Sequence, residues 1–98
     1  MQARRIVKII GKTMTTTQAE TQLITIEEYG FSYPNEYLRV VEFSIINRGS
    51  SAMNVQINDG DIISIEAGEG LSYGEDVEII SCIVKTNGAI FSWNGVLL

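Results

Sequence analysis

Catalytic chemistry in this chain is limited first by a residue type that it lacks. The sequence contains no histidine, which excludes Ser-His-Asp and Cys-His arrangements and the common histidine-containing zinc sites. Two pairs of adjacent carboxylates remain as candidates for acid-base work, Glu27-Glu28 and Glu75-Asp76. Neighbouring residues of a strand point to opposite faces, so adjacency alone does not form a catalytic pair. We therefore expect no enzymatic activity and no cofactor.

Two further features have the chemistry of ligand binding. Asn58-Asp59-Gly60-Asp61, with Glu66 nearby, offers oxygen ligands for Ca²⁺, but the spacing differs from the twelve-residue, helix-flanked calcium loop. A tight hairpin turn is the preferred interpretation, and we expect no metal. Cys82 is the only cysteine and lies in a nearly continuous apolar run. An apolar site raises a thiol pKa and no histidine is present to activate this one, so the pattern indicates a buried structural thiol.

An aromatic cluster is the sharpest binding candidate. It comprises Tyr29, Phe31, Tyr33 and Tyr37, with rings at every second residue from 29 to 33. Gly30 and Pro34 favour a loop there. Aromatic side chains on a loop suit a sugar platform or a protein-binding hot spot. The equal alternative is a loop that folds back to cap the open end of the fold.

Charge is unevenly distributed along the chain. Seven basic and twelve acidic residues give a net charge of −5, which disfavours nucleic-acid binding. Seven of the carboxylates fall between residues 59 and 78, and a basic group opens the chain: Arg4, Arg5, Lys8 and Lys12. The two groups either attract each other, within one chain or between copies, or form two solvated surfaces.

The sequence also bears on location. No apolar run approaches the roughly 18 residues of a membrane span, so no membrane partner is expected. The apolar part of the basic start is too short and too charged for a signal-peptide core. We expect a protein that is kept, or assembled, in the cytoplasm.

Frequent β-branched residues, with glycines between the apolar segments, predict an all-β protein without a convincing helix. Alternation predicts strands over residues 4–13, 23–28, 36–47, 53–57, 63–66, 71–74, 77–85 and 89–96, the seventh being central. Residues 13–22 suit a loop or an extended edge segment, and turns are expected at 47–51, 58–61, 67–70 and 86–88, the second and fourth as hairpins. This predicts one domain over residues 1–98, an antiparallel β-sandwich or jelly roll of seven to eight strands. The expected core contains Phe43, Ile45, Val55, Ile57, Ile79, Ile83, Phe91 and Trp93.

The first predicted strand has two possible roles. Residues 4–10 are strongly β-forming and basic, and an exposed strand of this kind must be paired or covered. It either pairs within its own sandwich or belongs to an assembly arm, residues 1–12, that adds as a strand to another copy or to a host lattice.

The second half of the chain resembles small β-sandwich proteins of tailed-phage virions, especially head-decoration and related accessory proteins. The likeness lies in the order of strands and turns over four segments: Ile45-Ile46-Asn47-Arg48-Gly49, Val55-Gln56-Ile57-Asn58-Asp59-Gly60, Ile63-Ser64-Ile65-Glu66-Ala67-Gly68-Glu69 and Ile83-Val84-Lys85-Thr86-Asn87-Gly88-Ala89-Ile90-Phe91-Ser92-Trp93. It covers about half of the chain and includes no site motif, so no functional residue is transferred.

The resemblance implies a non-catalytic virion protein that binds capsid or tail subunits. Such a protein would be a homo-oligomer, assembled in the host cytoplasm and located in the virion. The alternative function is a carbohydrate-binding or adhesin-like module that uses the loop aromatics and Trp93.

Overall fold

The computed structural model describes residues 8–24 and 40–97. These residues form strands and no helix, so no helix in them is able to cross a membrane. The strands are β1 (Lys8–Thr15), β2 (Thr21–Gln22), β3 (Val40–Asn47), β4 (Met53–Ile57), β5 (Ile62–Ile65), β6 (Gly70–Ser72), β7 (Cys82–Val84) and β8 (Ile90–Leu97). The expected all-β class is confirmed.

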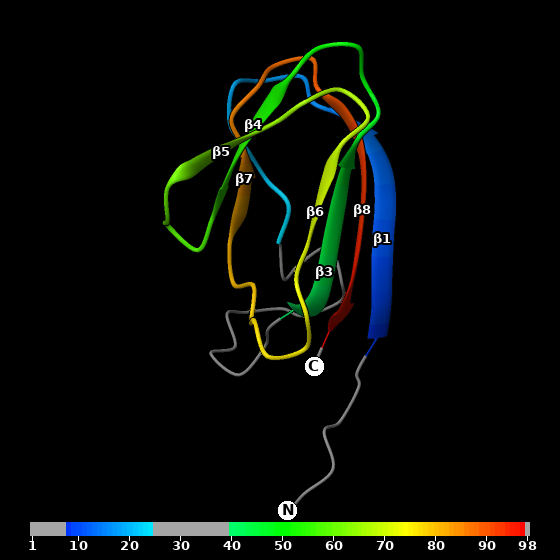
Figure 1. Ribbon diagram of the computed structural model, residues 1–98, viewed down its shortest axis with the longest axis vertical. Helices are drawn as coiled ribbons and strands as arrows, with labels where there is room; N and C mark the ends of the chain where they lie inside the picture. Colours follow the sequence, from blue (N-terminus) through cyan, green and yellow to red (C-terminus); the bar gives the residue numbers. More distant parts are fainter. Residues whose placement is uncertain (1–7, 25–39, 98) are drawn as a thin grey trace, which may run out of the picture.

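The strands form two antiparallel four-stranded sheets. The first sheet has the order β1-β8-β3-β6 and the second the order β2-β7-β4-β5. Consecutive strands alternate between the sheets, and only β4 and β5 are joined within one sheet (Figure 1). Eight strands wound in this order form a jelly roll, in which two Greek keys share one sandwich.

The core lies between the sheets. Six of the predicted core residues are buried there: Phe43, Ile45, Val55, Ile79, Phe91 and Trp93. The Phe43 and Trp93 rings, from neighbouring strands, have centroids 5.7 Å apart, within the range of favourable aromatic pairs. Ile57 is only partly buried and packs against this core. Ile83 was wrongly predicted: Cys82 and Val84 face inward, so alternation turns Ile83 outward and leaves it half-exposed.

Residues 77–85 do not form the continuous strand that their apolar character predicts. Ile79 makes an isolated bridge to Val40, Ile80 is 64% exposed, and only Cys82–Val84 form β7. The Asn58 side chain accepts hydrogen bonds from the N–H groups of Ile80 and Ser81 at 2.8 and 3.1 Å. These main-chain groups are therefore satisfied without a ladder. The short β7 does occupy the predicted central place, between β2 and β4.

The two predicted hairpins have different outcomes. Residues 58–61 do join β4 to β5: Asn58 and Asp59 have φ of 50° and 58°, and Gly60 N–H donates to the Ile57 carbonyl at 2.8 Å. Positive φ at both central residues is typical of a type I′ turn. The turn at 86–88 does not form a hairpin, because β7 lies in the second sheet and β8 in the first.

The N-terminal predictions are partly corrected. β1 pairs with β8 from Lys8↔Leu97 to Thr15↔Ile90, so residues 8–15 belong to their own sandwich, while residues 1–7 lie outside the described residues. The predicted loop or edge segment at 13–22 contains the end of β1 and then β2, which is an edge strand of the second sheet. In the strand predicted at 23–28, Leu23 and Ile24 are not in a strand, and the remainder lies outside the described residues.

A bulge interrupts β3. The pairing with β8 advances from Val41↔Val96 to Ser44↔Asn94, so β3 contains one extra residue there. Glu42 has φ of 51°, a conformation that costs an L-residue roughly 1–2 kcal/mol. Opposite the bulge, a side chain on Gly95 would collide with Val40. A glycine at this point thus admits the bulged strand.

Candidate interaction face and end pocket

The described residues contain little of the predicted binding sets. Arg4 and Arg5 of the basic group, and all four aromatic residues Tyr29, Phe31, Tyr33 and Tyr37, lie outside the described residues. Lys8 begins β1, and Lys12 is exposed on the same strand opposite Trp93. The structure therefore places only the C-terminal part of the predicted assembly arm, and places it at an edge of the first sheet.

This edge has a feature that protects it from pairing with another strand. Lys12 lies on the same face of β1 as Ile10 and Met14. Both of these residues pack on the core, yet the Lys12 side chain is exposed. A charge that points toward the interior from an edge strand is a common way to discourage added strands. The location of Lys12 therefore favours contacts through the face of this sheet over strand addition at its edge.

The outer face of the first sheet is almost free of charge. The side chains that alternate away from the core are small or aliphatic, and we call them the uncharged face: Ile9, Gly11, Thr13, Thr15, Val41, Ser44, Ile46, Gly70, Ser72, Ile90, Ser92, Asn94 and Val96. Of these, Val41, which pairs with Val96, is buried. Hydroxyl pairs cross it at 2.9 Å, Thr13 to Ser92 and Ser44 to Ser72. Charge adjoins it at Glu42 of the bulge and at Arg48, whose Nε donates to Ser92 Oγ at 3.2 Å.

The composition of this face is unusual for a solvated sheet. Soluble surfaces are designed with about 25–35% charged residues, whereas on β3 of this sheet the exposed charged residue is Glu42 of the bulge alone. Three large aliphatic side chains are exposed on it: Ile9 at 77%, Ile46 at 37% and Ile90 at 43%. Depletion of charge with exposed apolar side chains is typical of the centre of a protein–protein interface.

The carboxylates are located elsewhere. Asp59 and Asp61 are exposed at the β4–β5 hairpin, and Glu66 and Glu69 at the β5–β6 connection. In the part of the chain that the structure describes, no three such side chains gather in the way that holding a metal ion requires. These four carboxylates thus lie on connections that follow strands of the second sheet, whereas Glu42 of the bulge adjoins the uncharged face.

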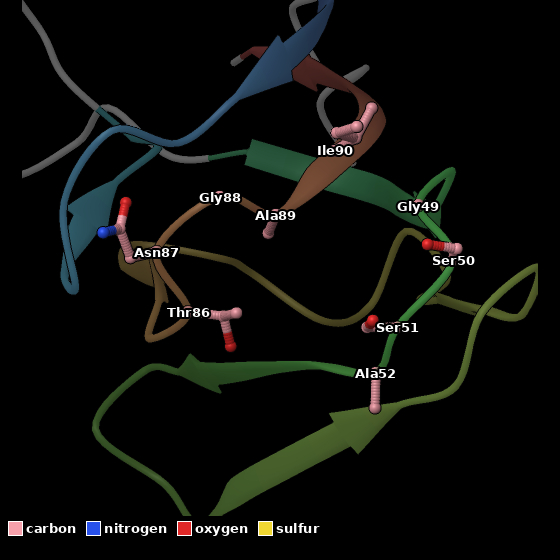
Figure 2. A pocket seen from close by; sticks show the side chains of 9 residues that line it. All are labelled: Gly49, Ser50, Ser51, Ala52, Thr86, Asn87, Gly88, Ala89 and Ile90. Atoms are coloured by element: carbon pink, nitrogen blue, oxygen red, sulfur yellow. The ribbon is translucent and has the colours of Figure 1, made fainter.

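A small pocket of about 190 Å³ opens at one end of the sandwich. Its walls are two connections between the sheets, residues 49–52 after β3 and residues 86–90 before β8. Figure 2 shows them facing each other, with Ser51 and Ala52 on one side and Thr86 and Ala89 on the other. The lining contains neither a charged nor an aromatic side chain.

Two buried polar side chains, those of Asn47 and Thr16, make hydrogen bonds to the main chain of these walls. Asn47 is 1% exposed. Its Nδ2 donates to the carbonyls of Ser51 and Ile65 at 2.8 and 2.9 Å, and its Oδ1 accepts from Gly49 N–H at 2.9 Å. Asn47 therefore attaches the first wall to the end of β5.

Thr16 has the same role for the second wall. It is 3% exposed, and its hydroxyl donates to the Thr86 carbonyl at 2.6 Å and accepts from Ala89 N–H at 2.9 Å. Its main chain adds bonds to Ala89 O and from Gly88 N–H at 2.9 and 3.1 Å. The side chains of Asn47 and Thr16 thus fix the main chains of the two walls by hydrogen bonds.

Sequence reasoning missed this pocket. Residues 47–51 and 86–88 were interpreted only as turns, because Gly, Ser and Asn are turn-forming residues. The available signal was a pair of small, polar turns in a fold that was expected to have two sheets. Which turns lie side by side depends on the winding order of the strands, and that order is a tertiary property.

Cys82 was correctly predicted as a buried thiol. It is 0% exposed in the core, and burial raises the pKa of its thiol to about 12. The thiolate, which is the nucleophilic form, is therefore suppressed at neutral pH.

Comparison of the chain with protein-family models, with curated proteins and with solved structures gave no match. The functional argument therefore depends on the sequence and on the geometry described above.

Proposed function

We propose that the protein is a non-catalytic structural protein that self-associates and docks on a larger protein lattice, in the manner of head-decoration and accessory proteins of tailed phages. Its partners are capsid or tail subunits and further copies of itself. Its location is the virion, after assembly in the host cytoplasm.

The uncharged face is the observation that carries this proposal. Each copy has a net charge of −5, so two copies that meet through acidic surfaces repel each other. The uncharged face allows two copies to meet with no like charges opposed, and it offers Ile9, Ile46 and Ile90 for burial. Burying apolar area contributes about 25 cal/mol per Å² before the costs of association. A second copy is therefore the occupant that this face fits best.

The winding of the strands supports the proposal by analogy. Jelly rolls are found in viral capsid proteins, and also in lectins and cupins. One fold serves many functions, so the topology is compatible with a virion role and does not select it. The uncharged face, rather than the topology, is therefore the main support for the proposal.

Sedimentation velocity of the full chain tests the proposal. We expect a mass that is a small multiple of the 10.8 kDa chain. The double variant Ile46→Lys and Ile90→Lys should sediment as a folded monomer, because it opposes four ammonium groups across a two-fold contact. The matched control is Ile62→Lys, since Ile62 is 57% exposed but lies on the second sheet. A monomeric wild-type chain, or a double variant with unchanged mass, would overturn the use of this face.

One observation favours a second function, a carbohydrate-binding or adhesin-like module. The end pocket is neutral and lined by hydroxyl, amide and main-chain groups. The mass measurement with a glycan array beside it separates the two functions, because only the assembly function requires the chain to oligomerise. Sugar binding by a chain that remains monomeric would favour the second function.

A further inference from the structure

The end pocket has the size of a site for one small molecule. Its volume is about 190 Å³, whereas pockets that enclose drug-sized ligands run to roughly 300–1,000 Å³. A long peptide or a nucleotide does not fit inside it. A single compact ring, or the end of a chain of such rings, does.

The polar groups of the lining have hydrogen-bonding capacity to spare. Ser50, Ser51 and Asn87 are among the residues that line the pocket, and no other described residue takes up the hydroxyl or amide groups of their side chains. Thr86 Oγ1 accepts from Asn54 N–H at 2.9 Å, which leaves its hydroxyl proton to donate. The pocket thus presents both donors and acceptors.

The electrostatics of the pocket select against charged ligands. No ionisable side chain lines it. The two cations next to the lining in sequence have partners elsewhere: Lys85 Nζ pairs with Glu20 Oε1 at 2.6 Å, and Arg48 Nε donates to Ser92 Oγ at 3.2 Å. An ion that entered the pocket would lose hydration without gaining an opposite charge. A purely apolar ligand would instead cover hydroxyl and amide groups that need hydrogen-bond partners.

The walls also combine small apolar surface with rigidity. Ala52 and Ala89 add methyl groups, and Gly49 and Gly88 keep side chains out of the space. Asn47 and Thr16 fix the main chain of both walls, as described above, so little ordering of the protein is needed when a ligand binds. A ring with hydroxyls on its edge and C–H groups on its faces matches these surfaces.

From these observations we propose that the end pocket binds a neutral, polyhydroxylated molecule of the size of one sugar residue, either free or at the end of a glycan. The inference does not rest on the proposed assembly role, because it is argued from the polar lining at Ser50, Ser51 and Asn87. Of the residues that line the pocket, Ile90 alone also belongs to the uncharged face. It also needs none of the aromatic residues 29, 31, 33 and 37.

Amide chemical-shift titration of the ¹⁵N-labelled full chain tests this inference. The probes are glucose, galactose, mannose and N-acetylglucosamine, each free and as the non-reducing end of an oligosaccharide, with glucuronate as a charged comparison. At least one neutral sugar should shift residues 49–52 and 86–90, with a Kd of about 1 mM or tighter, and glucuronate should bind more weakly. Equal affinity of the free sugar and the chain end identifies the single residue as the ligand, whereas tighter binding of the oligosaccharide identifies a glycan end.

Three variants make the assignment specific. Ser51→Leu fills the pocket and should weaken binding at least tenfold, and Asn87→Ala should weaken it severalfold. The matched control is Ser64→Leu, because Ser64 is exposed on β5, outside the pocket, and its binding should equal that of the wild type. Shifts that map to residues 29–37, the absence of any shift in a large excess of every sugar, or unchanged binding by a folded Ser51→Leu chain would each overturn the proposal.

Discussion

Replacing Asn47 with alanine tests the account of how this sandwich is closed at one end. The change removes three hydrogen bonds, to Ser51 O, Ile65 O and Gly49 N, of 2.8, 2.9 and 2.9 Å. Each such bond contributes about 0.5–1.5 kcal/mol net, and a buried group left without a partner costs more. The main-chain groups at 49 and 51 are only part-buried, so water replaces some of these bonds. We expect Asn47→Ala to lower the free energy of unfolding by about 2–4 kcal/mol.

Urea denaturation measures this loss. Trp93 is the only tryptophan and is 2% exposed, so its fluorescence reports on the core between the sheets. Midpoint and slope together give the free energy of unfolding for each variant. The matched control is Asn54→Ala, because the Asn54 side chain is exposed on β4, and it should change stability by no more than about 0.5 kcal/mol.

A second substitution separates hydrogen bonding from shape. Asn47→Asp keeps the size of the side chain but replaces a donor with an acceptor that faces the Ser51 and Ile65 carbonyls. At neutral pH it should cost at least as much as alanine, because the oxygen that replaces Nδ2 is charged, buried and faces two carbonyls. A loss below about 1 kcal/mol for both variants would show that Asn47 does not fasten the connection, and the reasoning would fail.

Three further predictions concern other parts of the sandwich. The pKa of the Cys82 thiol is about 12 in the folded chain and about 8.5 when unfolded, so above about pH 8.5 the unfolded chain releases a proton that the folded chain keeps. Stability should therefore hold below that pH and fall by about 1.4 kcal/mol per pH unit above it, and urea midpoints of Cys82→Ala should lack this component. Glu42→Val should cost about 1–2 kcal/mol, because a β-branched residue is poorly tolerated at positive φ, while Glu42→Gly should be neutral or stabilising in the same assay. Removing residues 1–12 deletes buried Ile10 and the part of β1 from Lys8 to Lys12, and should unfold the chain as measured by circular dichroism. A deleted chain that stays folded but becomes monomeric would instead support the assembly arm.

Strand-forming segments were largely predictable because alternation is a local property. Most of the large apolar residues that alternation turns inward in β3, β4 and β8 are buried, with Ile46 and Ile90 turned outward. The Asn58-Asp59-Gly60 turn reverses the chain where predicted. A period of two places successive side chains on opposite faces whatever the strand pairs with. The all-β class and most of the core follow from that rule.

The candidate site was not predictable in the same way. The basic and aromatic groups were chosen by residue type, and the described residues contain only Lys8 and Lys12 of them. The uncharged face and the end pocket consist of serine, threonine, asparagine, glycine and alanine, which have no distinctive signal along the chain. The face and the pocket form only when segments that are distant in sequence lie side by side in the folded chain.

By itself, the sequence determined the strands, the local turns and the absence of histidine chemistry. Only the tertiary structure decided that Asn87-Gly88 leads from one sheet to the other, that the run at 77–85 is divided between a bridge and a short strand, and that Asn47 is buried. The physical reason is the range of the interactions. Turn chemistry determines the direction of a few residues, but the partner of each strand is selected by burial and hydrogen bonding summed over the whole sandwich. Asn47 is tolerated in the interior because three main-chain groups converge on its side chain, two from the β3–β4 connection and one from the end of β5. That convergence exists only once both sheets have formed.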